Sequence, residues 1–301
     1  MAFTYEIKTD RQGNSYAEIT GAGVESQDLT VPENIDGIPV KSIASHAFAG
    51  AGVRQIFLPK SIETIRSFAF YGCLQLEKLS LHNGAQDLYD GVIRNCPSLS
   101  LIEVVCDIPD NYVTVRELLR DEDRGLRFHL LFPDGRELFL TFPEYVREAM
   151  EDTMARAIHF STEGAGVAYR ECVGKYRIDY DGYDRLTGRL TDYDFAAMVS
   201  ITLDRLMYPE ELRETAGARY EEFVSQNAAQ LLELLIRQKD TDRIRFLTEK
   251  DPALLDRSAL EKGAQCASAL GQTQICALIM DALMRGSRGQ DSDMLLMPEA
   301  W

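Results

Sequence analysis

A repeat of about 23 residues within the segment 29–105 restricts the possible folds of this chain most strongly. Three apolar positions recur with L-x-x-L-x-L spacing: Val53, Leu76 and Leu99; Ile56, Leu79 and Ile102; and Leu58, Leu81 and Val104. Because side chains along a strand alternate between two faces, this spacing predicts one short strand per repeat with an apolar inner face. Stacked units bury this face for one another. The sequence therefore predicts a solenoid with three full turns and a partial fourth, a fold that builds a binding surface rather than a catalytic cleft.

A second motif follows the strand in each repeat. In the second copy, residues 58–73 read Leu-Pro-x-Ser-Ile-x-x-Ile-x-x-x-Ala-Phe-x-Gly-Cys. This motif resembles the BspA-type leucine-rich repeat over roughly residues 20–106. The resemblance implies a right-handed solenoid whose strand face or loops bind proteins. It also implies a relationship to secreted or surface adhesins, since many relatives look like them.

The segments around the repeat predict an α+β protein of several domains. Period-two alternation in residues 3–7 and 16–20 predicts a hairpin that caps the first turn, so we place the first domain at 1–106. A junction at 107–190 contains a second predicted hairpin around Pro133-Asp-Gly-Arg136 and a helix over 145–159. This hairpin either closes the solenoid or opens a new domain. A helical domain at 191–286 and a flexible tail at 287–301 complete the division.

The helical domain contains a weak repeat of its own. Residues 240–247 match residues 271–278 at an offset of 31, and residues 258–271 between them suit an inner helix. A further long amphipathic helix is predicted over 220–237. The pattern has a weak resemblance to ankyrin helices over about 226–286, although the Thr-Pro-Leu-His motif is missing. Any stack of helical hairpins would satisfy the same spacing.

Charge restricts the class of partner. Lys and Arg number 32 against 48 Asp and Glu, which gives a formal net charge of −16. Nucleic acids and anionic membranes attract positively charged surfaces, so neither is an expected partner. A protein partner with a basic surface fits better. The acidity alternatively serves only to keep the chain soluble.

The N-terminal residues and the cysteines predict the compartment. The first residues show no basic segment followed by an apolar run, so no secretory signal is recognised. No apolar stretch approaches the length of a membrane span. Six cysteines form no CxxC pair, and we expect Cys73 and Cys96 to be small packing residues rather than a disulfide. We expect a cytoplasmic protein, or a secreted adhesin-like protein if an upstream signal is missing.

A search for catalytic motifs gives one candidate site. The segment 159–172 contains His159, Arg170 and Cys172, which would suit nucleophilic catalysis if the three side chains met in a pocket. An ordered junction explains the same residues more simply. The acidic run Asp179–Asp184 lacks the spacing of a calcium loop. We therefore predict no enzyme activity, no metal site and no cofactor.

The predicted binding surface is the outer face of the repeat strands. Residues between the inward apolar positions form two ladders, one from Thr30 to Glu103 and one from Asp28 to Leu101. Exposed aromatic side chains on such a face can anchor a partner. The alternative is that another part of the chain covers them. The predicted partner-binding residues of this interaction or scaffold protein are Thr30, Gln55, Phe57, Lys78, Ser80, Leu101, Glu103 and Val105.

Overall fold

The computed structural model describes two compact units, 1–197 and 198–301. It describes residues 3–23, 27–120, 122–152, 157–250 and 254–294, and only the backbone at 147–161, 192 and 286–294 within them. The finer division of the chain at 106, 190 and 286 stays a prediction.

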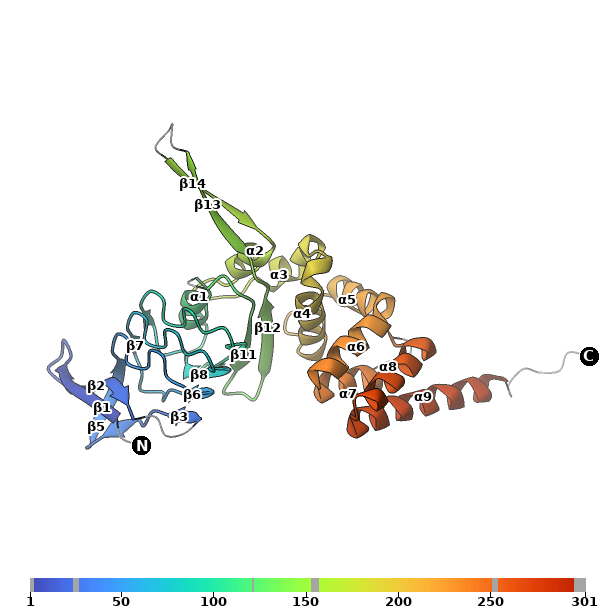
Figure 1. The fold of residues 1–301 in the computed structure, drawn as a ribbon, viewed down its shortest axis with the longest axis horizontal. Coiled ribbons are helices and arrows are strands. Elements are labelled where there is room, and N and C mark those ends of the chain that lie inside the picture. Colours follow the sequence, from blue (N-terminus) through green and yellow to red (C-terminus); the bar gives the residue numbers. More distant parts are fainter. Residues whose placement is uncertain (1–2, 24–26, 121, 153–156, 251–253, 295–301) are drawn as a thin grey trace, which may run out of the picture. The chain divides into compact units, whose positions relative to one another are not determined.

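Unit 1 begins with a hairpin that extends one sheet of the solenoid (Figure 1). Strand β1 (Phe3–Thr9) pairs antiparallel with β2 (Ser15–Ala22), and β2 pairs in parallel with β5 (Ile38–Ile43). The sheet continues through β7 (Thr64–Ile65) to β9 (Asp87–Leu88), while β4 (Asn34–Ile35) pairs with β5. The predicted capping hairpin is confirmed.

The second sheet carries the L-x-x-L-x-L strands. Its parallel strands are β3 (Asp28–Thr30), β6 (Gln55–Phe57), β8 (Lys78–His82), β10 (Leu101–Val105) and β11 (Leu126–Leu131). Antiparallel β12 (Glu137–Phe142) ends it, so the second hairpin closes the solenoid.

The solenoid therefore has about five turns, and the prediction of three turns and a part was wrong. The repeat interval lengthens from 23 residues to 26 between Ile102 and Phe128. In this last turn, helix α1 (Val113–Arg120) takes the place of the short strand that earlier turns contribute to the first sheet.

The third side of the solenoid is made by the Ala-Phe-x-Gly-Cys turns. Phe48 and Phe70 stack with ring centroids 5.7 Å apart. Each turn has a left-handed residue at the glycine position of this motif: Gly50, Gly72 and Asn95 have φ of 71°, 69° and 62°. Glycine adopts this conformation without a side-chain clash, which explains its place in the motif.

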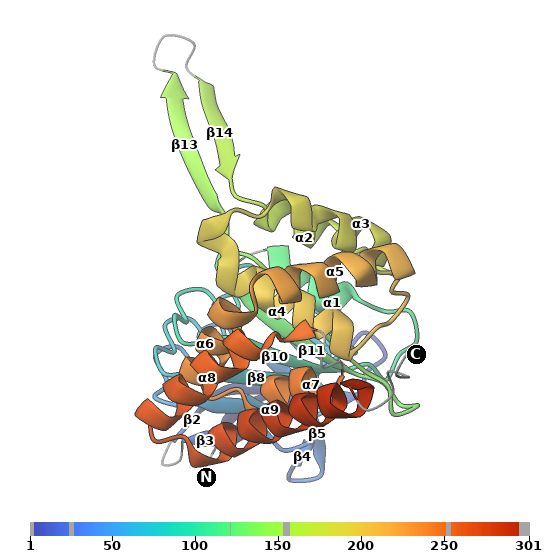
Figure 2. The same ribbon diagram turned by 90° about the vertical axis from the view of Figure 1, so that its right-hand side faces the viewer.

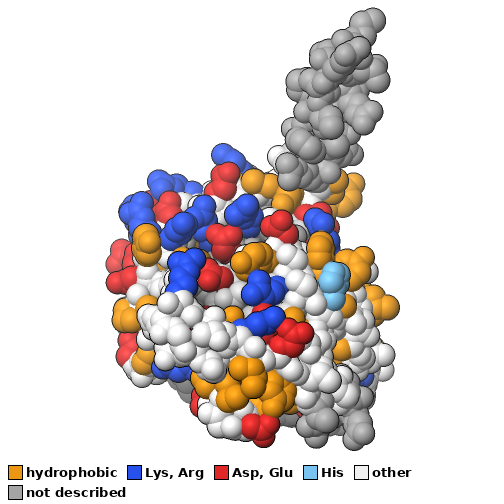
Figure 3. Space-filling model, turned by 90° about the vertical axis from the view of Figure 1, so that its left-hand side faces the viewer, with side chains coloured by type: hydrophobic (Ala, Val, Ile, Leu, Met, Phe, Trp, Pro, Cys, Tyr) orange, Lys and Arg blue, Asp and Glu red, His pale blue; other side chains and the backbone are white. Residues whose placement is uncertain are grey.

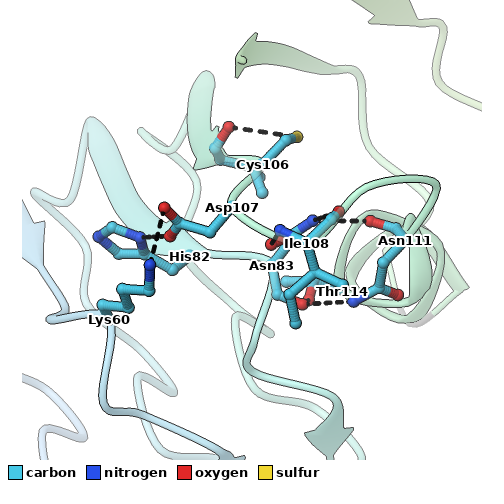
Figure 4. A network of polar contacts seen from close by, with 9 residues as sticks. Lys60, His82, Asn83, Cys106, Asp107, Ile108, Asn111 and Thr114 are labelled. Atoms are coloured by element: carbon cyan, nitrogen blue, oxygen red, sulfur yellow. Dashed lines mark hydrogen bonds and ion pairs between the residues drawn. The ribbon is translucent and has the colours of Figure 1, made fainter. Parts of the chain in front are cut away.

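Helix α1 is fixed to the last turns by a buried asparagine (Figure 4). The Asn83 side chain donates to the carbonyls of Ile108 (2.8 Å) and Asn111 (3.1 Å), and it accepts from the Ile108 N–H (3.0 Å). Thr114 of α1 donates to the carbonyl of Ala85 (2.8 Å). The last turn has no strand in the first sheet, and these side-chain hydrogen bonds hold it to the previous turn instead.

The segment after β12 differs from the prediction. Residues 145–159 were predicted as a helix, but β13 (Val146–Asp152) and β14 (Ala157–Glu163) form a two-stranded antiparallel hairpin. Cross-strand pairing outweighs the helix propensity of this segment. Short helices α2 (Gly166–Glu171) and α3 (Tyr180–Arg185) follow, then the 3-10 turns Leu186–Arg189 and Asp192–Asp194.

Helix α4 (Phe195–Met207) leads into unit 2, which continues with α5 (Glu214–Gln226), α6 (Ala228–Gln238), α7 (Thr241–Lys250), α8 (Arg257–Ala269) and α9 (Thr273–Met294). Helix α6 packs on α8, and α7 packs on α9 (Figure 2). Gly263 permits the close approach of α8, because an added Cβ would lie 3.3 Å from Leu232. Helices α6–α7 and α8–α9 are thus two stacked pairs.

The single helix predicted over 220–237 is wrong. It is divided at Asn227, whose side-chain amide donates to the Phe223 carbonyl at 2.9 Å. Helix α9 continues into the predicted tail as far as Met294, and residues 295–301 lie outside the described residues.

Candidate functional site: the strand face

The outer surface of the second sheet, here called the strand face, has the alternation that the sequence predicts. Its parallel register aligns the outward side chains into two straight ladders: Asp28, Gln55, Lys78, Leu101 and Arg127; and Thr30, Phe57, Ser80, Glu103 and His129. Val105 lies on the same face, opposite His82 and Leu131. The inward residues Ile56, Leu79 and Ile102 are completely buried, so packing fixes the register of the face.

Glu103 is the centre of a polar cluster on this face. Its carboxylate accepts hydrogen bonds from Lys78 Nζ (2.8 Å) and Ser80 Oγ (3.0 Å), and it lies 3.5 Å from His129 Nδ1. Burial alone would raise the pKa of Glu103, but the hydrogen bonds from Lys78 and Ser80 outweigh it and lower the pKa. Glu103 is therefore held ionised, and its charge is balanced by Lys78.

An aromatic group lies beside this charge. His129 stacks on Phe139 with centroids 4.0 Å apart, and its Nε2 lies 2.8 Å from Glu137. The Arg127 guanidinium covers the Phe139 ring at 4.0 Å. Sequence reasoning missed these residues. The alternation of Leu126-Arg-Phe-His-Leu was visible, but its 26-residue interval hid its place in the repeat.

The eight predicted residues lie on one face but not in one cluster. Lys78, Ser80 and Glu103 are in contact, and Phe57 joins them because Lys78 Nζ lies 5.8 Å from its ring centroid. Thr30 and Gln55 lie on the first strands of the sheet, whereas Leu101 and Val105 lie on β10. Half-buried Phe57 is the aromatic residue of the predicted set.

A second polar surface covers the sheet that contains β1, β2 and β5. Glu18, 5% exposed, accepts from Arg66 Nε (2.6 Å) and Ser42 Oγ (2.9 Å) beside a polar hollow of about 740 Å³. In Figure 3, positive and negative side chains are interleaved on the side of these strands. The sequence did not indicate this cluster, because its three members lie 24 residues apart in different turns.

The candidate catalytic residues have structural contacts. Arg170 donates to the carbonyls of Pro143 (2.6 Å), Gly166 (2.9 Å), Arg124 (2.6 Å) and Glu122 (3.1 Å). It thereby links α2 to the chain before and after the second sheet's last strands.

The other two candidates give no support to a nucleophilic site. Burial raises the pKa of the Cys172 thiol to about 11, whereas a nucleophilic cysteine needs a lowered one. The backbone of His159 lies in β14, and its side chain lies outside the described residues.

Two further findings concern the described part of the chain. It contains no group of three or more His, Cys, Asp or Glu side chains arranged to hold a metal ion. Among its helices, none combines the length and the apolar composition needed to cross a lipid bilayer.

The family comparison agrees with the geometry of unit 1. Residues 25–114 match the family described as BspA type Leucine rich repeat region, in six copies. This segment is a BspA-type leucine-rich repeat. Among solved structures, the chain is similar to the T. pallidum Leucine Rich Repeat protein, with 18% identity and a TM-score of 0.24 over 33% of this chain and 68% of that one. No curated protein matches the chain.

Proposed function

We propose that the BspA-type repeat binds a protein partner through its strand face, as an interaction or scaffold module without a catalytic step. The observation that carries the proposal is the cluster of Phe57, Lys78, Ser80 and Glu103 on three neighbouring strands. Aromatic side chains beside oriented charges are typical of the residues that dominate protein interfaces. A rigid strand ladder holds them in place before binding, which reduces the entropy lost on association.

The charge of the partner is a second part of the proposal. The net charge of −16 favours a basic partner, and Glu103 supplies a fixed carboxylate on the face. The same face carries Lys78, which is paired with Glu103, and Arg127, so the partner is expected to present both basic and acidic groups. Raising the salt concentration should slow association if such steering operates.

A pulldown with matched variants tests the strand face. Full-length wild type, Phe57→Asp and Tyr71→Asp are used with the host lysate. Tyr71 is 40% exposed on the turn side and controls for the loss of a surface aromatic residue. A partner retained by wild type and Tyr71→Asp but lost by Phe57→Asp supports the proposal. A partner list unaffected by Phe57→Asp contradicts it.

We also propose that unit 2 is an ankyrin-like stack. Lys239 and Gly271, which follow α6 and α8, both adopt the left-handed conformation, with φ of 58° and 67°. Gln272 links the pairs by donating to the Ile236 carbonyl at 2.8 Å. Equivalent turns joined in this way are typical of helical repeat proteins. An experimental structure in which α6–α7 does not superpose on α8–α9 would reject the proposal.

For the compartment, we propose the cytoplasm. The six cysteines are unpaired, which suits a reducing environment. Fractionation of host cells with an antibody to the chain tests this, and recovery in the medium or on the cell surface would favour the adhesin-like alternative.

A further inference from the structure

Strand β1 leaves one edge of the first sheet open. It has seven residues and, within the described part of the chain, pairs with β2 alone. The opposite edge of this sheet and the last strand of the second sheet are both contacted by other parts of the chain. The Tyr183 hydroxyl donates to the Thr141 carbonyl of β12 (2.5 Å) and accepts from its N–H (3.0 Å), while α1 packs against β9. An open edge strand presents backbone donors and acceptors to another strand.

Hydrogen bonds on either side of the hairpin show which backbone groups of β1 are available. Asp10 and Asn14 are a hydrogen-bonded pair across the hairpin, since the Asp10 N–H donates to the Asn14 carbonyl at 2.9 Å. Ile19, which lies opposite Tyr5, uses its carbonyl on the other side of β2, where it accepts from the Ala44 N–H. Antiparallel pairs alternate between hydrogen-bonded and non-hydrogen-bonded positions. Glu6 and Lys8 therefore use their backbone groups toward β2. Those of Tyr5, Ile7 and Thr9 point to the open edge.

The side chains of β1 are complementary to a second copy of the same strand. In an antiparallel arrangement centred on Ile7, Ile7 lies opposite Ile7 of the other copy and Glu6 lies opposite Lys8. Tyr5 then lies opposite Thr9. A twofold axis produces each opposite-charge pair twice, and such cross-strand pairs stabilise a sheet.

Backbone and side chains agree on this register. The residues whose backbone groups point outward, Tyr5, Ile7 and Thr9, fall at its hydrogen-bonded positions, giving about six inter-strand hydrogen bonds. Glu6 and Lys8 fall at the other positions, where opposite side chains lie closest. Their Oε2 and Nζ atoms are already 2.6 Å apart within the strand, so both side chains extend over one face.

Ile7 supplies an apolar reason for pairing. It lies opposite Ala17, which is completely buried, yet Ile7 itself is 58% exposed. The inner face of β1 thus projects beyond the first turn of the solenoid. A second copy of β1 would cover Ile7 with an identical side chain and remove apolar surface from water.

We propose that two copies of this chain form a dimer by antiparallel pairing of β1 with β1 about a twofold axis at Ile7. This joins the two copies' first sheets into one continuous sheet. A single strand pair buries less surface than stable dimers do, so the dimer is reversible and its population depends on concentration. The strand face takes no part in it.

Sedimentation velocity of the full chain over a wide concentration series tests the proposal. Glu6→Lys and Lys8→Glu each place like charges opposite one another twice, and each should weaken dimerisation by about tenfold. The double variant Glu6→Lys/Lys8→Glu restores opposite charges and should recover the wild-type affinity. Glu77→Lys and Arg11→Glu are the matched controls, because they make the same charge changes at exposed positions outside β1.

Rescue by the double variant separates strand pairing from a general charge effect. Urea unfolding checks that each variant folds like wild type. A wild type that stays monomeric throughout the series would overturn the proposal, as would single variants that dimerise normally or a double variant without rescue. Loss of the dimer in Phe57→Asp would place the interface on the strand face and also overturn it.

Discussion

Asn83 and Asn111 are joined by reciprocal hydrogen bonds: each side-chain amide donates to the other residue's backbone carbonyl, at 3.1 Å and 2.7 Å. The exchange links β8's end to the segment before α1, and Asn83 is completely buried. These two bonds hold the chain to the previous turn at the point where its sequence no longer follows the repeat motif.

Asn83→Ala should therefore destabilise unit 1. The substitution removes the partner of the buried Asn111 carbonyl and of the part-buried Ile108 backbone groups, which we expect to cost about 2 kcal/mol of unfolding free energy. Urea unfolding followed by circular dichroism measures it. Asn34→Ala, at an exposed site on β4, is the control and should change stability by less than about 0.5 kcal/mol. Equal effects of the two variants would disprove the structural role of Asn83.

Alanine substitutions at Gly91 and Gly50 distinguish a steric clash from backbone strain as causes of lost stability. Both have positive φ, of 69° and 71°, so Ala at either position should cost about 1 kcal/mol in backbone strain. A Cβ at Gly91 would also lie 2.5 Å from the Phe68 ring, while nothing lies within 4 Å of one at Gly50. We expect Gly91→Ala to lose about 2 kcal/mol more than Gly50→Ala in urea unfolding. Equal losses would show that the Phe68 ring moves aside freely.

Lys239 offers a stabilising substitution in unit 2. Its φ of 58° ends α6 in the left-handed conformation, at an exposed site where glycine is favoured. Lys239→Gly should raise the unfolding free energy of unit 2 by about 0.5–1 kcal/mol. The neighbouring Gln238→Gly, still within the helix, should lower it by a similar amount. Changes of the same sign in the two variants would contradict the helix boundary.

The repeat was predictable from sequence where its interval is constant. Residues 53, 76 and 99 share one environment, so the same residue types recur and the strand ladders follow from them. The fifth turn was missed because α1 lengthens the interval before Phe128. Local alternation shows which side chains of a strand point outward. The position of that strand in the sheet depends instead on contacts between residues that are distant in sequence.

Two local features of the chain misled the prediction. Residues 145–159 favour a helix by composition, but pairing between β13 and β14 prevails. Asn227 divides a continuous amphipathic pattern, since its side chain hydrogen-bonds the preceding turn.

The Glu18 cluster depends on the turn-to-turn stacking of Ser42 and Arg66, which no single stretch of sequence displays.

Cysteine labelling tests the catalytic alternative. Cys73, Cys96, Cys106 and Cys172 are buried, and Cys266 and Cys276 are half-exposed. Burial raises the pKa of Cys106 to about 12 and that of Cys172 to about 11, so few thiolates form there below pH 9. Brief alkylation of the native chain at pH 8, read by mass spectrometry, should modify the two half-exposed cysteines first. The same treatment in denaturant should modify all six equally. Rapid modification of native Cys172 would restore the nucleophile hypothesis.

Glu18 should make stability depend on pH. Burial alone would raise its pKa, but hydrogen bonds from Arg66 and Ser42 hold the pKa below its ordinary value. A carboxyl group with a lower pKa in the folded chain stabilises it above its unfolded pKa of about 4.3, and this contribution disappears as the pH falls through the folded value. Glu18→Gln should therefore lose stability at pH 7 by about 2 kcal/mol, from the buried charged hydrogen bonds.

The pH dependence of the difference is the decisive measurement for Glu18. We expect the difference in unfolding free energy between wild type and Glu18→Gln, measured with urea, to be smaller at pH 3 than at pH 7, because wild-type Glu18 is losing its charge at pH 3. Glu63→Gln is the control, since Glu63 pairs with Lys41 on the same surface with 61% of its side chain exposed. Its difference from wild type should be small at both pH values. A Glu18→Gln difference that stays constant between pH 7 and pH 3 would show that the charge of Glu18 does not stabilise the first sheet.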